Sequence, residues 1–272
     1  MPQIDLPEID VSVVIPTFHR QAQLLEAIGS VLAQAKVSVE VIVVDDSADG
    51  SARAAVSSVS DPRVRYITQK EPSGGLPALP RNEGARLAGG RYLYFLDDDD
   101  LLMPDTLAVM SDALQATPHA GMVFGTVEPF GPDERMLRHN QQYFSRARDI
   151  ARRLRGAGAL HASLVFRPSI LVNSACMARR SAFEAVGGYD PDIPICEDAD
   201  LWGRIAYSSG GYVFLDRPVV RYRTGAPSLM HNLAEKDQKL HVSYRRIQQK
   251  YRRAQGPVRF LARKLWVRAV LR

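Results

Sequence analysis

Residues 92–105 read YLYFLDDDDLLMPD, a short apolar run that ends abruptly in four aspartates. The apolar part, Tyr92–Leu96, has the length and composition of a strand that is buried on both faces of a sheet. Pro104 lies where a first helical turn would begin, so we expect a helix from there to about residue 116. The stretch therefore predicts a strand–loop–helix unit with a row of carboxylates at the carboxyl end of its strand.

Apolar runs of the same kind lie upstream of this unit. Val11–Ile15 (VSVVI) ends at Pro16, and Val39–Val44 (VEVIVV) ends at Asp45 and Asp46. Apolar spacing and Gly/Pro-rich loops predict the other elements of this half, which are helices over about 21–35, 50–58 and 78–88 and strands at Val64–Thr68 and Met122–Val127. Strands that alternate with helices in this way predict an α/β fold with a doubly wound, mostly parallel central sheet flanked by helices.

The second half of the chain is less regular. Here we expect strands at Ile170–Ala178 and Tyr212–Leu215, helices near 180–186 and 197–208, and a helical, basic segment from about residue 233.

The composition excludes several classes of protein. A chain of 272 residues with 46% hydrophobic and 24% charged residues is an ordinary globular protein, and is neither a disordered tail nor a fibre. Two cysteines, Cys176 and Cys196, are too few for a disulfide framework and fit a reducing compartment, so we expect a cytoplasmic protein. We expect no transmembrane helix, because no stretch of about 18 apolar residues occurs. We also expect no secretory signal, because residues 1–10 are acidic and lack an apolar core.

The charge is distributed unevenly. Residues 241–272 contain ten Lys/Arg and no Asp/Glu, whereas the rest of the chain carries 25 basic and 30 acidic residues. A mildly acidic body followed by a basic tail indicates an anionic partner for the tail, such as a membrane surface, a nucleic acid or another protein.

Two groups of carboxylates follow predicted strands and would leave the same edge of the sheet. Asp45 and Asp46 could accept hydrogen bonds from a nucleobase or from ribose hydroxyls, or could cap the next helix. The run Asp97-Asp98-Asp99-Asp100 suits Mg²⁺ or Mn²⁺ together with substrate phosphates, or could be a solvated acidic loop. Together the two groups fit a nucleoside diphosphate held through its base, ribose and metal.

A third acidic group, Glu197-Asp198-Ala-Asp200, begins a predicted helix. It could supply a general base for an acceptor hydroxyl, or it could be a set of carboxylates stabilised by the helix dipole. The pair Arg81-Asn82 precedes another helix and could contact phosphate, or Arg81 could be solvated. The glycine fingerprint of dinucleotide-binding proteins is absent after the first strand, which argues against a nicotinamide or flavin cofactor.

The segments VSVVIPTFHR, VIVVDDSADGS, LPRNEGARLAGGRYLYFLDDDDLLMPD, GGYDPDI and CEDADLWGRIAYSSG occur in that order. This ordered set resembles the family 2 inverting glycosyltransferases of the GT-A fold, over about residues 11–225. The resemblance implies a GT-A domain over 1–232, with a nucleotide-binding half (about 11–127) and an acceptor or catalytic half (about 128–232). The basic helical segment 233–272 would then be a C-terminal extension.

The resemblance also implies roles for individual residues. Asp45 and Asp46 would hold the base and ribose, flanked by Pro16 and Thr17, and Arg20 would belong to the same nucleotide site. Asp97 and Asp98 would hold the ribose and the metal, with Asp99 as the principal ligand of Mn²⁺ or Mg²⁺. Asp198 would be the catalytic base, Arg81 would approach the diphosphate, and the acceptor-side candidates are Gly188, Tyr189 and Glu197. One departure is His19, which stands where relatives often have Asn.

The function implied is metal-dependent, inverting transfer of a hexose or N-acetylhexosamine from a nucleotide sugar to an acceptor hydroxyl in cell-surface glycan synthesis. UDP is the expected nucleotide, with dTDP and GDP as alternatives, and the acceptor would be a glycan or a lipid-linked glycan. Other possible functions are a sugar-1-phosphate nucleotidyltransferase and a non-catalytic protein that binds sugar nucleotides or glycans. The first of these should show a Gly-rich basic loop after the first strand, where this chain has PTFHRQAQ.

The basic tail is the last sequence feature with a predicted partner. We expect residues 241–272 to bring the enzyme to an anionic membrane surface, peripherally on the inner face of the cell membrane, while nucleic acid is not expected as a partner. Val258, Leu261, Leu265 and Ala269 would share one helix face. The alternative is a helix packed on the catalytic domain or on a second subunit.

Overall fold

The computed structural model describes residues 9–167, 170–225 and 233–270. The expectation of no secretory signal rests mainly on residues 1–8, and the basic tail ends at residues 271–272. Both segments lie outside the described residues.

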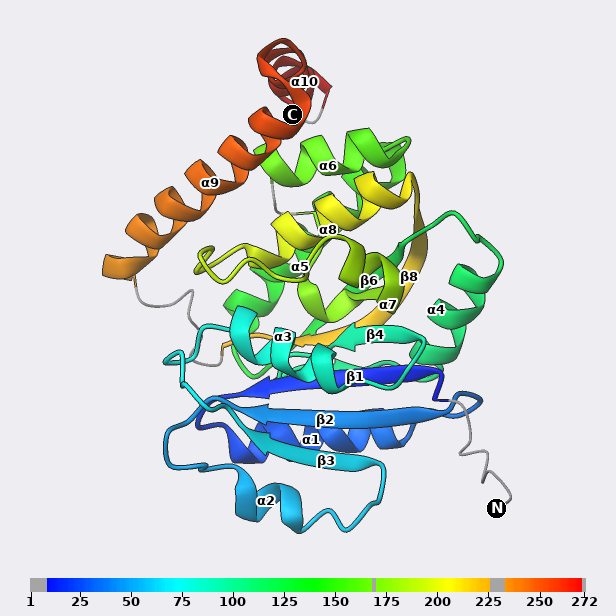
Figure 1. Cartoon of the computed structure of the whole chain (residues 1–272), viewed down its shortest axis with the longest axis vertical. Helices are drawn as coiled ribbons and strands as arrows, with labels where there is room; N and C mark the ends of the chain where they lie inside the picture. Colours follow the sequence, from blue (N-terminus) through cyan, green and yellow to red (C-terminus); the bar gives the residue numbers. More distant parts are fainter. Residues whose placement is uncertain (1–8, 168–169, 226–232, 271–272) are drawn as a thin grey trace.

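The described chain forms one curled eight-stranded sheet in the order β3-β2-β1-β4-β7-β6-β8-β5 (Figure 1). Its strands are β1 (Val11–Thr17), β2 (Val39–Asp45), β3 (Val64–Thr68), β4 (Tyr92–Phe95), β5 (Leu101–Leu102), β6 (Met122–Phe130), β7 (Cys176–Arg179) and β8 (Tyr212–Arg223). The first four strands are parallel and so are β6 and β8, whereas β7 and β5 run antiparallel to their neighbours. The prediction of a mostly parallel α/β sheet is confirmed.

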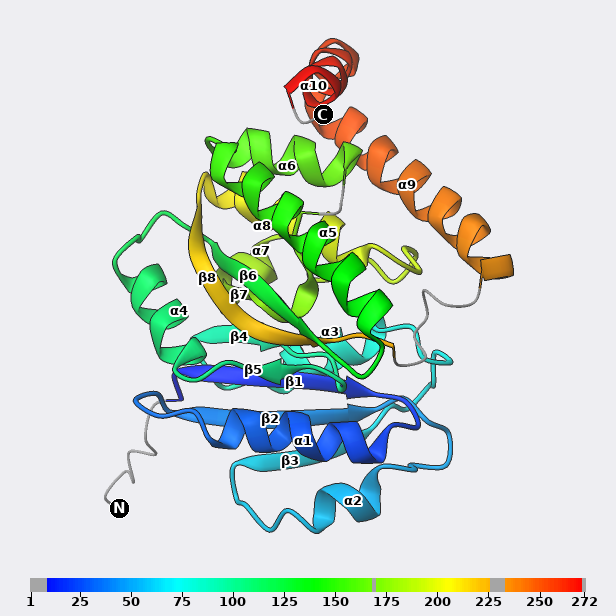
Figure 2. The ribbon, with the colours of Figure 1, turned by 180° about the vertical axis from the view of Figure 1, so that it is seen from behind.

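Helices cover both faces of this sheet (Figures 1 and 2). They are α1 (Gln21–Leu32), α2 (Arg53–Ser57), α3 (Ala78–Leu87), α4 (Thr106–Gln115), α5 (Glu134–Arg153), α6 (Ala157–Phe166), α7 (Arg180–Ala185), α8 (Glu197–Ser209), α9 (Leu233–Gln255) and α10 (Pro257–Val270), with a 3₁₀ turn η1 (Asn173–Ala175).

The apolar strands read as continuous runs because they are buried on both sides. In β1, Val13 and Ile15 face the cluster that contains α1 and α4, whereas Val14 faces the cluster that contains α3 and α8. Alternate residues of one strand therefore serve two separate cores, and both must be hydrophobic.

Two predicted strands differ from the structure. The run Ile170–Ala178 is not one strand, because η1 interrupts it and only Cys176–Arg179 pairs with its neighbours. Asn173 in this turn donates from its side-chain amide to the carbonyl of Phe95 at 3.1 Å, which holds the chain in the turn. The predicted short strand Tyr212–Leu215 continues instead to Arg223, because irregular register opposite Gly125–Val127 carries it past Pro218.

Two helices between β6 and η1 were not predicted. Helix α5 is largely polar and buries only Ala147, Ile150 and Ala151, so few apolar residues mark its buried face. Helix α6 is hard to predict for the opposite reason: eight of its ten residues are buried, so it has no polar face. A helix that is hydrophobic all round gives no amphipathic signal.

The basic segment forms two helices, α9 and α10, as the sequence predicts. Ile247, Tyr251 and Val267 are buried in the same core cluster as α6 and α8, so both helices pack on the domain. Within the described ranges, no helix combines the length and the hydrophobicity needed to cross a membrane.

Candidate functional site

The predicted acidic groups meet at one edge of the sheet. Thr17 at the end of β1 pairs with Asp45 at the end of β2, and β4 lies on the other side of β1. The carboxyl ends of the three strands are therefore adjacent, and the loops that follow them share this edge.

The Asp45 carboxylate accepts hydrogen bonds from neighbouring residues of β3 and of the loop that follows β2. One carboxylate oxygen accepts from the backbone and hydroxyl of Ser47, at 3.0 and 2.6 Å, and the other accepts from Ala52 N and Tyr66 Oη, at 2.9 and 2.7 Å. Burial opposes ionisation, but these hydrogen bonds, led by Ser47, hold the pKa of Asp45 below its usual value. Asp45 thus orders the turn that leads into α2.

Asp46 is held by the loop before α3. Its carboxylate accepts from Ser73 N at 2.8 Å, from Ser73 Oγ at 2.7 Å and from Gly75 N at 2.7 Å. These N–H and O–H donors are of the type that a nucleobase and a ribose present. The side chain is therefore equipped to accept such donors, and the 73–75 loop supplies them here.

The first loop connects β1 to the aspartate run. Thr17 donates from its hydroxyl to Asp98 at 2.7 Å, and its carbonyl accepts from Asp46 N at 2.9 Å. Arg20 Nη1 lies 3.0 Å from Asp98 Oδ1 and 2.9 Å from Asp99 Oδ2. Pro16 is half-buried and precedes this turn. The structure therefore brings together the predicted nucleotide-site residues of β1 and the acidic loop.

His19 adopts a left-handed conformation in this loop, with φ of 56°. Asn, Asp and His are enriched in this conformation among residues other than glycine. The backbone therefore explains why His can stand where the predicted family often has Asn.

The aspartate run suits a cation. Burial, followed by the neighbouring charge of Asp97, raises the pKa of Asp99 to about 6, although Arg20 opposes the shift. Burial and the neighbouring carboxylate disfavour the ionised form of Asp99, so a bound cation would stabilise it. Carboxylate oxygens are hard donors, which suit Mg²⁺ or Mn²⁺. The donor set thus fits the predicted metal. No group of three or more His, Cys, Asp or Glu side chains converges as a metal site in the described part of the chain.

Arg81 is the centre of the site. Its side chain is buried and donates from Nη2 to Asp97 and from Nη1 to Glu197, each at 2.5 Å. The guanidinium also lies 5.3 Å from the centre of the Tyr189 ring, and its Nε is buried with no hydrogen-bond partner among the described residues. Arg81 therefore connects the acidic loop after β4 to the start of α8, two segments about one hundred residues apart.

Asp198 and Glu197 begin α8, as predicted. Asp198 is half-buried and accepts from the backbone N–H of Ala199 at 2.8 Å. Burial raises the pKa of Asp198, against the effect of Arg81, and burial likewise raises the pKa of Glu197 to about 7. A carboxylate with a raised pKa is a stronger base than an ordinary one. Glu197 is bound to Arg81, whereas no protein side chain donates to Asp198 in the described residues.

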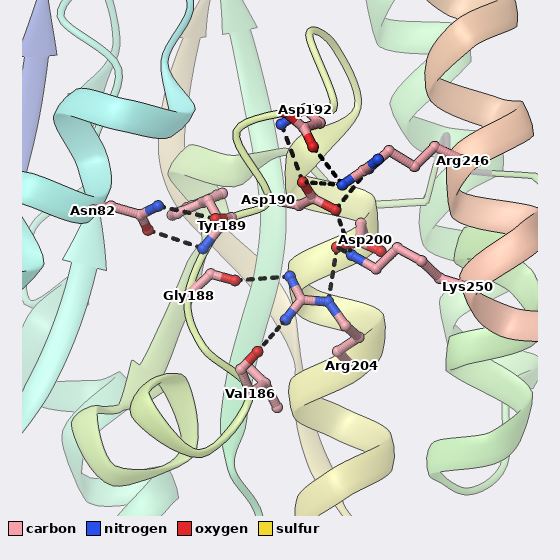
Figure 3. A network of polar contacts seen from close by, with 10 residues as sticks. All are labelled: Asn82, Val186, Gly188, Tyr189, Asp190, Asp192, Asp200, Arg204, Arg246 and Lys250. Atoms are coloured by element: carbon pink, nitrogen blue, oxygen red, sulfur yellow. Dashed lines mark hydrogen bonds and ion pairs between the residues drawn. The ribbon is translucent and has the colours of Figure 1, made fainter. Parts of the chain in front are cut away.

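The loop before α8 contains the acceptor-side candidates. Asn82 accepts from Tyr189 N and donates to Tyr189 O, both at 2.9 Å, and Figure 3 shows this paired contact. The Tyr189 hydroxyl donates to Asn173 at 2.6 Å. Gly188 has φ of +70°, and a Cβ there would lie 2.7 Å from Asn82 Oδ1. The loop is therefore held rigidly against α3, and glycine is required at 188.

A charged network fixes this loop to α9 (Figure 3). Asp190 accepts from Arg246 at 2.9 Å and from Lys250 at 3.0 Å, and Lys250 also reaches Asp200 at 2.7 Å. Arg204 donates to Asp200 at 2.7 Å and to the carbonyl of Gly188 at 2.8 Å. Burial opposes the shift, but Arg246 and Lys250 hold the pKa of Asp190 down to about 2.

Sequence reasoning missed two contributors to the site, Arg223 and Arg246, and the partner of a third, Asn82. Arg223, at the end of β8, donates from Nε to the carbonyl of Asp99 at 2.8 Å and from its backbone N to Asp100 at 2.9 Å. Its position at the carboxyl end of a strand was the available signal, but the strand was predicted to end earlier. Arg246 carried no local signal, because its partners are distant in sequence. Asn82 was predicted only as a possible phosphate contact beside Arg81, and the structure pairs it with Tyr189.

The comparisons with known proteins agree with this geometry. The model of the family "Glycosyl transferase family 2" matches residues 12–187. A relative from Campylobacter jejuni, GalNAc(5)-diNAcBac-PP-undecaprenol beta-1,3-glucosyltransferase, is 35% identical over 118 residues, which is 42% of this chain and 37% of that protein. The chain spans less than half the length of the first curated relatives that it matches.

Two solved structures share the fold. TarS 1–349 of S. aureus in complex with UDP-GlcNAc has a TM-score of 0.66 and 17% identity, covering 94% of this chain and 72% of that one. The mannosyltransferase PcManGT of Pyrobaculum calidifontis, in complex with GDP-Man and Mn²⁺, has a TM-score of 0.65 and 20% identity, covering 96% and 69%. The predicted GT-A architecture is thereby confirmed.

Proposed function

The chain belongs to glycosyl transferase family 2, and we propose that it catalyses metal-dependent, inverting transfer of a sugar from a nucleotide diphosphate sugar to an acceptor hydroxyl. The observation that carries the proposal is the contact of Arg81 with both Asp97 and Glu197. This contact joins the acidic loop, which would hold the donor, to the start of α8, where Asp198 would act on the acceptor.

The donor would lie across the carboxyl ends of β1, β2 and β4. Asp46 would accept from the nucleobase after the 73–75 loop releases it, while Asp45 maintains the turn beside it. Pro16 and Thr17 would flank the base, and Arg20 and Asp98 would complete the nucleotide site. Asp97 and Asp99 would hold Mn²⁺ or Mg²⁺, which when bound offsets the charge of the departing diphosphate. UDP would be the nucleotide, as in one structure of this fold that carries UDP-GlcNAc, and GDP, which another carries as GDP-Man, is the alternative.

The protein's own groups would perform the proton transfer. The Asp198 carboxylate removes the proton of the acceptor hydroxyl while that oxygen bonds to the anomeric carbon. The bond from the anomeric carbon to the diphosphate oxygen breaks on the opposite face, so the configuration inverts. Glu197 is bound to Arg81, which leaves Asp198 as the base. The buried guanidinium of Arg81 lies between the carboxylates of Asp97 and Glu197. To contact the diphosphate, Arg81 would have to give up one of these two partners.

The acceptor would approach over Gly188, Tyr189 and Glu197. We propose a lipid-linked glycan, because the Campylobacter relative is named for an undecaprenol diphosphate acceptor. The reaction would then take place on the cytoplasmic side of the cell membrane, in synthesis of a cell-surface glycan. The free thiols of Cys176 and Cys196 fit that compartment.

The test is transfer from UDP-sugars with Mn²⁺ or with a chelator, together with the variant Asp198→Asn. We expect the variant to lose about 10²–10⁴ in rate, since a positioned base is removed, while UDP affinity is unchanged. Asp112→Asn, which changes an exposed carboxylate on α4, is the control and should retain activity. Wild-type turnover by Asp198→Asn would move the base to Glu197 or Asp200, and a product with retained anomeric configuration would refute the mechanism.

A further inference from the structure

Helix α10 has a face that packs on the domain. Val267 is 3% exposed and lies in the main core cluster. The ring of Phe260 lies 5.2 Å from that of Phe166 on α6 and 6.3 Å from that of Tyr251 on α9. These contacts determine which side of α10 is turned away from the protein.

The outward side of α10 is apolar. Val258, Leu261 and Leu265 are 80%, 58% and 56% exposed. At 100° per residue they lie within about 60° of one another, and they point opposite to Phe260 and Val267. The exposed residues Ala262 and Ala269 belong to the same stripe. The amphipathicity of α10 is therefore two-sided, with one apolar face that binds the protein and one in water.

Basic side chains border this stripe. Lys264 and Arg268 lie along one side of it and Arg259 along the other, and no Asp or Glu occurs anywhere in residues 241–272. None of these three cations forms an ion pair within the residues that the structure covers. An exposed apolar stripe with cations on both sides is the pattern of a helix that lies in the plane of a membrane interface.

Helix α9 contributes less than α10 to the exposed apolar and basic surface. Two of its cations, Arg246 and Lys250, are bound to Asp190, and Ile247 and Tyr251 are buried. The network of Figure 3 therefore anchors α9 to the loop before Asp198. Because α10 follows α9 directly and packs on α6, the exposed stripe is held in a fixed place relative to the catalytic half.

We propose that α10 is the membrane-binding element of this protein and that its occupant is the surface of an anionic lipid leaflet. Acyl chains would cover Val258, Leu261 and Leu265, and anionic headgroups would meet the flanking cations. A second copy of the chain fits poorly, because two α10 stripes in contact would bring together like charges. A nucleic acid would neutralise the cations but leave the apolar stripe in water.

The experiment is co-sedimentation of the full-length protein with anionic phosphatidylglycerol vesicles and with neutral phosphatidylcholine vesicles, at low and high salt. One variant changes Val258, Leu261 and Leu265 to Ser, and a second changes Lys264 and Arg268 to Glu. The matched charge control changes Arg135 and Arg146, exposed cations of α5, to Glu. All changed side chains are at least partly exposed, so the variants should fold, and far-ultraviolet circular dichroism verifies this.

We expect the wild type and the α5 control to bind anionic vesicles, and each α10 variant to lose about tenfold or more in partitioning. Binding of the wild type should weaken with salt. Equal binding by all four proteins, or none by the wild type at low salt, would overturn the proposal. So would a dimer in light scattering that the serine variant abolishes, or a preference for an oligonucleotide over the vesicles. The measurement requires no sugar transfer, so its outcome is independent of the proposed reaction.

Discussion

Removal of Arg81 should destabilise the protein in a way that depends on its two carboxylate partners. The variant Arg81→Met keeps most of the side-chain volume but leaves Glu197 buried without its cation. Removal of one partner of a buried ion pair typically costs about 3–5 kcal/mol. Asp97 contributes less to this cost, because its side chain is 34% exposed and water can replace the guanidinium.

The pH dependence of the loss follows from Glu197. Burial raises the pKa of Glu197 to about 7 even beside Arg81, and without Arg81 this pKa must rise further. Below pH 7 the folded forms of both proteins carry a protonated Glu197, so this part of the difference is small. Above pH 7 the wild type ionises and the variant does not, so the loss grows by about 1.4 kcal/mol per pH unit until the variant ionises too. We therefore expect about 3–5 kcal/mol at pH 8.5 and about 2 kcal/mol less at pH 6.

Urea unfolding of the wild type, Arg81→Met, Glu197→Met and the double variant measures these terms as a cycle. With an m-value of about 3 kcal/mol/M, the Arg81→Met midpoint should fall by about 1–1.7 M at pH 8.5. The double variant should recover most of the loss, because an apolar pair of similar volume often replaces a buried ion pair without cost. A loss below about 1 kcal/mol, or a double variant no more stable than Arg81→Met, would refute the reasoning.

Three further predictions concern the metal, the acceptor loop and the C-terminal packing. Asp99→Asn should weaken Mn²⁺-dependent UDP binding about tenfold or more in calorimetry, with Asp105→Asn as the control, and unchanged affinity would remove Asp99 from the metal site. Gly188→Ala should lower the unfolding free energy by more than Gly187→Ala, because both have positive φ but only at 188 would a Cβ lie 2.7 Å from Asn82 Oδ1. Thermal unfolding compares the two variants. Equal losses of unfolding free energy would mean that only the backbone strain of a left-handed alanine acts, at about 1–2 kcal/mol, and not the contact with Asn82. Burial lowers the pKa of His161 to about 4, so neutral His161 contributes stability above pH 6.5 that is lost as the pH falls toward 4. Relative to wild type, His161→Phe should gain about 2 kcal/mol in urea unfolding between pH 7.5 and pH 5, and a constant difference would contradict this.

The amino-acid sequence alone determined the parallel half of the fold. In β1, β2 and β4 each strand is a mainly apolar run, interrupted by Ser12 and Glu40 in the first two, with polar residues at its end. Local composition therefore indicates both the strand and its boundary. For the same reason the acidic residues Asp45, Asp46 and Asp97–Asp99 could be assigned to one edge of the sheet. The order of parallel strands connected by helices allows few other arrangements.

Only the tertiary structure decided which side chains meet. Arg81 could equally have been a solvated residue by local pattern, and its contacts with Asp97 and Glu197 join segments that lie far apart in the chain. Helix α6 has no periodic signal because it is buried on all sides, and β8 passes a proline through irregular pairing. The basic tail is a further example. Its charge and hydrophobicity can be read from the sequence, but which face of α10 packs on α6 cannot. Composition and periodicity act within a few residues, whereas burial and ion pairing depend on segments that only the folded chain brings together.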